Sequence, residues 1–150
     1  YGPMETYIDR HNAARIGKYS ISVNENFEHY IAPQENSSHF GTRWGIVNDA
    51  HGNGLYFSGY NLHDFCFNAS HYTSEILTST KHDFELKPLK QTVINLDWKM
   101  NSISQNTQIA AIEKDRILND KKFCFSFRIL PVNITEIEPF QILNEKLYSI

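Results

Sequence analysis

The sequence predicts an all-β fold, an antiparallel sandwich with one short helix near residues 74–80. Short segments in which apolar and polar side chains alternate recur along the whole chain, as they do in half-buried strands. Ten Phe and eight Tyr stand against two Met, and flat aromatic rings pack well on pleated sheets. The connections are rich in Gly, Asn and Asp, which suits hairpins and therefore antiparallel pairing.

The N-terminal part is expected to contain little regular structure. Residues 1–18 are rich in turn-forming residues and predict irregular, extended chain. Residues 19–23 alternate, which predicts a strand with Tyr19 and Ile21 on one face. Pro33 argues against a central strand over residues 27–33, because proline cannot donate to a ladder of backbone hydrogen bonds.

A hairpin is the clearest prediction. Residues 42–48 and 55–60 read as strands, and residues 49–54 between them tolerate the backbone angles of a tight turn. Residues 64–70 alternate again and predict a strand with Phe65 and Phe67 on one face.

One short helix is predicted after this strand. Thr73 is a suitable N-cap, and Glu75 lies in the first turn, where the helix dipole favours a carboxylate. The helix is expected to end by about residue 81. Residues 82–86 and 91–98 then predict two more strands, with Pro88 turning the chain between them.

The strongest alternation in the chain covers residues 122–130. Phe123, Phe125, Phe127 and Ile129 would share one face of this strand. Pro131 is expected to end the strand. Residues 132–150 show little pattern and predict a surface tail or a loose extra element.

Composition excludes several classes of function. The chain has 150 residues and a net charge of −3, so one domain is expected and electrostatic binding of nucleic acid is not. No run of 18 apolar residues predicts a membrane span. No signal peptide is visible, so a cytoplasmic location is expected.

The usual catalytic and metal-binding motifs are absent from the sequence. The seven His have no ligand-like spacing, so no metal site is predicted. Gly-x-Ser-x-Gly and phosphate-binding loops are missing as well. Of the aromatic side chains that could stack on sugars, Trp98 is the one expected at a strand end near a loop.

Particular strings resemble the last domain of bacterial β-galactosidases of glycoside hydrolase family 2. The string Tyr1-Gly2-Pro3-x-Glu5-x-Tyr7-x-Asp9-Arg10 resembles the family's Gly-Pro-x-Glu-x-Tyr-x-Asp-Arg stretch. Further strings resemble the family in the same order, namely residues 30–36 (Tyr-Ile-Ala-Pro-Gln-Glu-Asn), 42–44 (Thr-Arg-Trp), 67–75, 95–97 (Asn-Leu-Asp) and 125–128 (Phe-Ser-Phe-Arg). The resemblance therefore covers residues 1–131 and leaves 132–150 as a divergent tail.

This resemblance implies a fold and a function. The family's last domain is a large antiparallel supersandwich, similar to sugar mutarotases, and this chain would be its C-terminal half. The enzymes hydrolyse terminal β-D-galactose residues of galactosides such as lactose with retention. Their catalytic Glu pair, and the Mg²⁺ and Na⁺ or K⁺ that they use, belong to a separate barrel domain. No catalytic residue and no cofactor is therefore expected in this chain, and its partners would be the remaining domains or a large subunit, in an oligomer.

The resemblance also suggests roles for individual residues. One loop of the family is Gly-rich, carries Trp or Cys and reaches toward the active site. Here residues 101–108 have lost these glycines, and Gln108 stands near the Trp or Cys position. The candidates for substrate contact are Gln108, Asn106 and Trp98. The remaining motif residues are expected to be structural: Glu5, Tyr7, Asp9, Arg10, Glu35, Asn36, Arg43, His71 and Tyr72. Glu35 and Asn36 would form a turn, and Arg43 would pair with Glu5 or Asp9 in the interior.

Three functional interpretations remain at this point. The first is a non-catalytic part of a β-galactosidase that helps to shape the substrate site, which predicts an exposed apolar surface where the rest of the sandwich packs. The second is a stand-alone carbohydrate-binding or mutarotase-like module, for which His71 and Glu35 would be the acid–base pair. The third is a purely structural assembly domain.

Overall fold

A computed structural model describes residues 1–103 and 118–144 of the chain. The chain forms two compact units. The first unit consists of Tyr1–Phe40 and Cys66–Asn119, and the second of Gly41–Phe65 and Asp120–Ile150. Each unit is therefore built from two separate stretches of the sequence.

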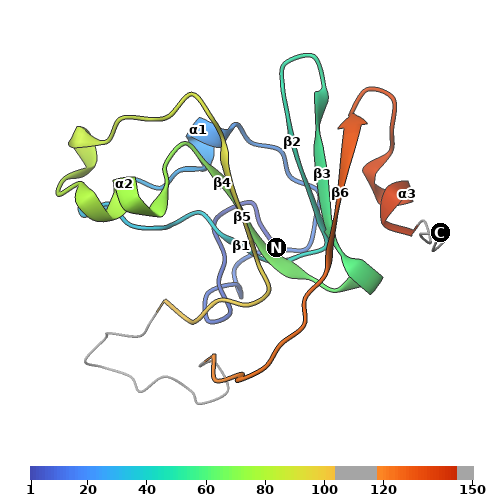
Figure 1. The fold of residues 1–150 in the computed structure, drawn as a ribbon, viewed down its shortest axis with the longest axis horizontal. Helices are drawn as coiled ribbons and strands as arrows, with labels where there is room; N and C mark the ends of the chain where they lie inside the picture. Colours follow the sequence, from blue (N-terminus) through green and yellow to red (C-terminus); the bar gives the residue numbers. More distant parts are fainter. Residues whose placement is uncertain (104–117, 145–150) are drawn as a thin grey trace. The chain divides into compact units, whose positions relative to one another are not determined.

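Two three-stranded sheets account for the regular structure (Figure 1). The first has the strand order β1-β4-β5, with β1 at His39–Thr42, β4 at Phe65–Ser70 and β5 at Val93–Asp97. The second has the order β2-β3-β6, with β2 at Trp44–Asn48, β3 at Asn53–Gly59 and β6 at Phe127–Asn133. The pairs β2–β3, β3–β6 and β4–β5 are all antiparallel, which confirms the predicted fold class.

The helical elements are short. They are α1 (Val23–Asn26), α2 (Ser74–Ser79), α3 (Pro139–Asn144) and the 3-10 turns η1 (Tyr60–Leu62) and η2 (Asp83–Glu85). The predicted helix near 74–80 is confirmed as α2. As expected, the Thr73 side chain caps it by accepting a hydrogen bond from the Ile76 amide at 3.3 Å.

The predicted hairpin is also confirmed. Trp44 pairs with Ser58, and Asn48 pairs with Gly54 at the closed end. Gly52 lies in the turn with φ of +85°, a backbone conformation that glycine adopts without strain. Figure 1 shows β2, β3 and β6 side by side, with β3 in the middle.

Two predicted strands are wrong, because local hydrogen bonds favour helical turns there. Residues 19–23 do not form a strand: Ser22 and Glu25 form a capping box that starts α1, and Ile21 is 52% exposed. Residues 82–86 form the turn η2, in which the Glu85 side chain accepts from the His82 amide. Alternation over five residues does not make a strand without a partner edge.

The last strand is shifted relative to its prediction. It begins at Phe127 rather than 122, because β3 offers partners only from Asn53 to Gly59 and the chain then enters η1. It also continues through Pro131, which β6 tolerates as an edge strand. In the segment predicted to be a surface tail or a loose extra element, the structure forms the short helix α3, and Ile142 is buried.

The hydrophobic core of each unit is small. In the first unit it contains Tyr7, Phe27, Cys66, Ala69 and Leu77, and in the second Tyr56, Phe57, Phe65 and Ile142. Among the described residues of the first unit, buried polar side chains are as prominent as buried apolar ones. They include Thr6, Asn36, Ser37, Ser38, Asn68 and Ser70. These buried polar residues need hydrogen-bond partners, which the interior of the same unit must supply.

Candidate functional site

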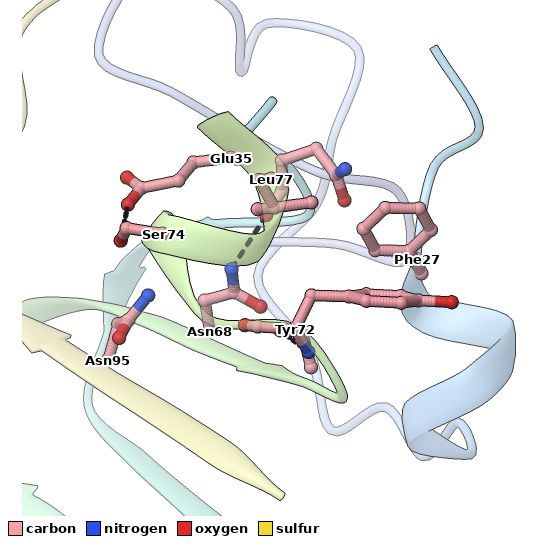
Figure 2. Close-up of a pocket in the computed structure, with 9 residues that line it drawn as sticks. Phe27, Glu35, Asn68, Tyr72, Ser74, Leu77 and Asn95 are labelled. Carbon is pink, nitrogen blue, oxygen red and sulfur yellow. Dashed lines mark hydrogen bonds between the residues drawn. The ribbon is translucent and has the colours of Figure 1, made fainter. Parts of the chain in front are cut away.

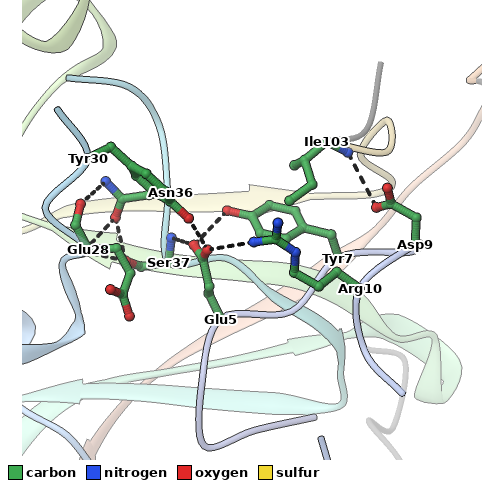
Figure 3. A network of polar contacts seen from close by, with 9 residues as sticks. All are labelled: Glu5, Tyr7, Asp9, Arg10, Glu28, Tyr30, Asn36, Ser37 and Ile103. Carbon is green, nitrogen blue, oxygen red and sulfur yellow. Dashed lines mark hydrogen bonds and ion pairs between the residues drawn. The ribbon is translucent and has the colours of Figure 1, made fainter. Parts of the chain in front are cut away.

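A network centred on Glu5 organises the N-terminal segment of the first unit (Figure 3). The Glu5 side chain is 8% exposed. Its Oε2 accepts from the Tyr7 hydroxyl at 3.0 Å and from the Ser37 amide at 2.8 Å, and its Oε1 accepts from the Tyr30 hydroxyl. The Arg10 guanidinium nitrogen Nη1 lies 3.7 Å from Glu5 Oε1. Glu5 thus joins the segments around residues 7, 30 and 37.

Both tyrosines of this network resist ionisation. Burial, followed by the nearby Glu5 carboxylate, raises the pKa of Tyr7 far above its ordinary value. The hydrogen bond to Glu5, followed by burial, also raises the pKa of Tyr30. Tyr7 and Tyr30 therefore act as hydrogen-bond donors over the physiological range of pH.

Asn36 fixes the turn that follows Pro33. It is 3% exposed, and its Oδ1 accepts from the Glu28 amide at 3.1 Å. Its Nδ2 donates to the carbonyls of Glu28 and Gln34, each at 3.0 Å. Asn36 thus holds the turn together in the way that its position after Pro33 suggested.

The expected interior ion pair of Arg43 is not observed. Arg43 is exposed, and the cation beside Glu5 is Arg10, whose side chain is 61% exposed. The Asp9 carboxylate instead accepts from the Ile103 amide at 3.3 Å. The string of residues 1–10 therefore supplies its own cation for Glu5, and both Glu5 and Asp9 accept hydrogen bonds from backbone amides.

Two cavities that share four lining residues border strands β4 and β5 of the first sheet. Glu35, Asn36, Asn68 and Asn95 line both of them. The first cavity is completed by Phe27, Ser70, Tyr72, Ser74 and Leu77, and the second by Tyr7, Ser38, Asp97 and Met100. Figure 2 shows the Asn68 amide in the middle of the residues that line the first cavity.

The strand register explains why these side chains meet. Asn68 of β4 pairs with Asn95 of β5, and Cys66 pairs with Asp97. Paired residues, and residues two apart on one strand, lie on the same face of a sheet. Glu35 approaches this face from its turn and accepts a hydrogen bond from the Ser74 hydroxyl at the start of α2.

The cavities are too small for a sugar. Each has a volume of about 10 Å³, which is close to the space that one water molecule needs. Sites for small organic ligands are typically about 300–1,000 Å³. A pyranose ring therefore does not fit into either cavity, although an ion or a water molecule does.

The ionised form of Asp97 is disfavoured in this region. It is half-buried, and burial is the main reason why its pKa lies above the ordinary value, with the negative charge of Glu35 adding to the effect. Across residues 1–103 and 118–144, no group of three or more His, Cys, Asp or Glu side chains is arranged to hold a metal ion.

The candidate substrate-contact residues lie near one end of this region or outside the described chain. Trp98 directly follows β5 and is half-buried, and the Lys99 ammonium lies 4.2 Å from its ring centroid. This cation covers part of the ring, so stacking of a sugar on that face would have to displace it. Asn106 and Gln108 lie outside the described residues.

The flanks of residues 104–117 are held in place by the first unit. Asn101 Oδ1 accepts from the Leu118 amide at 2.8 Å, so the described residues on either side of this segment contact each other. The Ile103 amide donates a hydrogen bond to the Asp9 carboxylate, which links Ile103 to the N-terminal string 94 positions away in the sequence.

The other motif residues have structural contacts. The Tyr72 ring packs against Phe27 with centroids 4.6 Å apart. His71 Nδ1 lies 2.9 Å from the Gln91 carbonyl, so this ring nitrogen donates. Within the part of the chain that the structure describes, no hydrogen bond or ion pair joins His71 to Glu35, so the pair required for a mutarotase-like mechanism is not assembled.

Some residues of this region were not singled out from the sequence. Ser37 and Ser38 are 1% and 3% exposed, and Asn68 occupies an unassigned position of the 67–75 string. A polar run directly after Pro33 was the available signal, because a loop that stays polar while it is buried must form hydrogen bonds.

No helix of the described residues has the length and apolar character needed to cross a membrane.

Comparison with known proteins identifies the family to which the chain belongs. Residues 1–129 match the family model of the beta galactosidase small chain. The chain is similar to a beta-galactosidase of Actinobacillus pleuropneumoniae, with 32% identity over 87% of this chain and 12% of that protein. It is also similar to the beta-galactosidase of Streptococcus thermophilus, with 33% identity over 89% of this chain and 13% of that protein.

A third relative, the beta-galactosidase of Staphylococcus xylosus, is 30% identical over 85% of this chain and 13% of its own length. The chain thus spans about one eighth of the length of these relatives. The family match covers residues 1–129 of the 150, and it includes Glu5, Glu35 and every strand except the last part of β6. This chain therefore belongs to the β-galactosidase small chain family.

Proposed function

We propose that this chain is a non-catalytic part of a β-galactosidase that hydrolyses terminal β-D-galactose residues of galactosides such as lactose. It would help to shape the substrate site through Trp98, Asn106 and Gln108, while another domain would supply the catalytic Glu pair and its metal ions. The proposed setting is a cytoplasmic oligomer that contains the remaining domains or a large subunit.

The size of the cavities beside the carboxylates is the observation that carries this proposal. Retaining hydrolysis places two carboxyl groups about 5–5.5 Å apart, on either side of a bound sugar. Glu5 is occupied by buried hydrogen bonds, and the cavities that Glu35 and Asp97 line measure about 10 Å³. These carboxylates therefore have no room for a sugar between them.

An exposed apolar surface on the second sheet supports association with the rest of an enzyme. Phe57 pairs with Ile129, and Leu55 lies two residues from Phe57 on the same face. Phe127 and Ile129 of β6 are 46% and 48% exposed, and Leu55 is 42% exposed. An exposed apolar face was expected for a chain that completes a larger β structure, and the exposure of these three side chains supports that expectation.

The experiment is an activity assay on a chromogenic β-galactoside. The chain alone is expected to be inactive, and activity is expected when it is mixed with a fragment that carries the barrel domain. Ile129→Lys should weaken this complementation, because it puts a charge on the apolar face of the second sheet. Ile31→Lys is the matched control, since Ile31 is 92% exposed and belongs to the first unit.

Each outcome bears on a different part of the proposal. Activity of the chain alone would refute its non-catalytic role. Equal loss of complementation in the Ile129 and Ile31 variants would refute the assignment of the second sheet as the docking face. If complementation is normal and Gln108→Ala leaves KM and kcat unchanged, the chain has only an assembly role.

A further inference from the structure

The turn η1 places two apolar side chains in solvent at the end of β3. Tyr60 is 43% exposed and Leu62 is 62% exposed. The last residue of β3, Gly59, pairs with Phe127 at the start of β6. The Tyr60 amide donates to the Ser126 carbonyl at 2.8 Å. The turn therefore lies directly beside the place where β6 begins, within the second unit.

Two consecutive residues of this turn have a left-handed backbone. Asn61 has φ of 55° and ψ of 37°, and Leu62 has φ of 62°. Asparagine tolerates this conformation better than leucine, whose Cβ lies too close to the following carbonyl oxygen. Among the described residues other than glycine, Ser37 shares a positive φ with these two, and Leu62 is the apolar member of the three. Leu62 thus has an unfavourable backbone and little burial to compensate for it.

Neighbouring contacts hold the turn in this shape. A Cβ on Gly59 would lie 1.9 Å from the His63 carbonyl oxygen, so the chain passes close to itself on either side of the turn. The His63 amide donates to the Tyr60 carbonyl at 3.3 Å, in addition to the bond from Tyr60 to Ser126. Backbone strain persists where the surrounding structure imposes it, and such places are often binding sites. A preformed turn also loses less conformational entropy when it binds.

The surroundings of the turn favour an apolar partner. The strands beside it carry the exposed side chains of Leu55, Phe127 and Ile129. Arg128, between Phe127 and Ile129, faces the other side of β6 and donates to the Ile142 carbonyl at 3.0 Å. About seven eighths of the length of the β-galactosidase relatives lies outside the part that matches this chain. That part of the enzyme is large enough to supply an apolar pocket.

We propose that Leu62, on the preformed turn η1, is an anchor that inserts into an apolar pocket on the remaining part of the β-galactosidase. This inference rests on the proposed function and deepens it, because it names one residue that fixes the chain to its partner. Anchor residues of this kind carry much of the binding energy of an interface. Burial of the Leu62 side chain in the complex would compensate for the strain that the isolated chain carries.

Calorimetric titration of the full chain into a fragment that carries the barrel domain tests the anchor. Leu62→Ala should bind about tenfold more weakly or worse, because the pocket loses its apolar filling. Leu62→Gly should bind as weakly as Leu62→Ala. In urea unfolding of the chain alone, Leu62→Gly should have a folded-to-unfolded ratio about threefold higher than Leu62→Ala, because glycine adopts a positive φ without strain. A residue that packs only within its own chain would instead lose stability in both variants and leave docking unchanged.

Ile16→Ala is the matched control, because Ile16 is 66% exposed and belongs to the first unit. It should bind as the unaltered chain does. Absence of binding by the unaltered chain would overturn the inference, as would equal affinity of the unaltered chain and Leu62→Ala, or equal stability of the alanine and glycine variants. Binding that Leu62→Ala weakens, but that gives no galactosidase activity, would support the anchor and refute only the proposed function.

Sedimentation of the chain without the fragment distinguishes another occupant. Self-association of the unaltered chain that Leu62→Ala abolishes would overturn the inference, because it would assign Leu62 to a contact between two copies of this chain. A chain that stays monomeric over the same range of concentration supports the proposed partner.

Discussion

Replacement of Glu5 by alanine should destabilise the first unit far more than removal of its ion-pair partner. Glu5→Ala leaves the Ser37 amide and the Tyr7 hydroxyl without acceptors, at positions that are 1% and 5% exposed. Each buried, unsatisfied donor costs about 1–3 kcal/mol. The donors on Tyr30 and Arg10 are more exposed and regain water. The loss should therefore be about 4 kcal/mol, a large part of a typical domain's stability of about 5–15 kcal/mol.

Arg10→Ala is the matched comparison. The Arg10 side chain is 61% exposed, and exposed ion pairs contribute less than about 1 kcal/mol. Glu5→Gln should fall between the two, because the amide retains one oxygen acceptor.

Urea unfolding monitored by Trp98 fluorescence measures the effect on the first unit. A Trp44→Phe background removes the second tryptophan, which belongs to the other unit. The midpoint should fall strongly for Glu5→Ala with little change in slope. If Glu5→Ala and Arg10→Ala lose the same free energy of unfolding, the buried hydrogen bonds of Glu5 contribute no more to stability than its exposed ion pair.

The remaining predictions concern a cap, a turn and a titration. Thr73→Ala should destabilise α2 by about 1 kcal/mol, because the Ile76 amide loses its capping acceptor; Thr73→Ser should restore most of this loss in urea unfolding. Gly54→Ala should disrupt the β2–β3 hairpin by about 2–3 kcal/mol, because a Cβ there would lie 2.2 Å from the Val47 carbonyl; an unchanged circular dichroism melt would contradict the register. Burial and the Glu35 carboxylate raise the folded-state pKa of Asp97, so the stability that its protonated form contributes is fully present below pH 3.8 and is lost as the pH rises through the folded-state pKa. Asp97→Asn should therefore unfold at a higher temperature than the unaltered chain at pH 7 and lose the advantage at pH 3; the reverse order would show that Asp97 is stabilised as an anion.

The hairpin and the helix followed from local signals. Gly and Asn in residues 49–54 favoured a turn whatever packed around it, and Thr73 caps α2 with its own side chain. Local alternation was misleading where local hydrogen bonds competed, as at Ser22 and Glu25. It also misplaced the start of β6, because the length of that strand is set by its partner β3 and not by its own phenylalanines.

The sequence by itself determined the antiparallel β class, the positions of the hairpin and of α2, and the strings that resemble β-galactosidases. These features depend on residues that are close in the chain. Only the tertiary structure brought Glu5 to Ser37, Asp9 to Ile103, and Glu35 to the face that carries Asn68 and Asp97. The reason is physical: a side chain's sequence neighbours set its local conformation, whereas the groups that satisfy its hydrogen bonds and charge come from segments that only folding brings together.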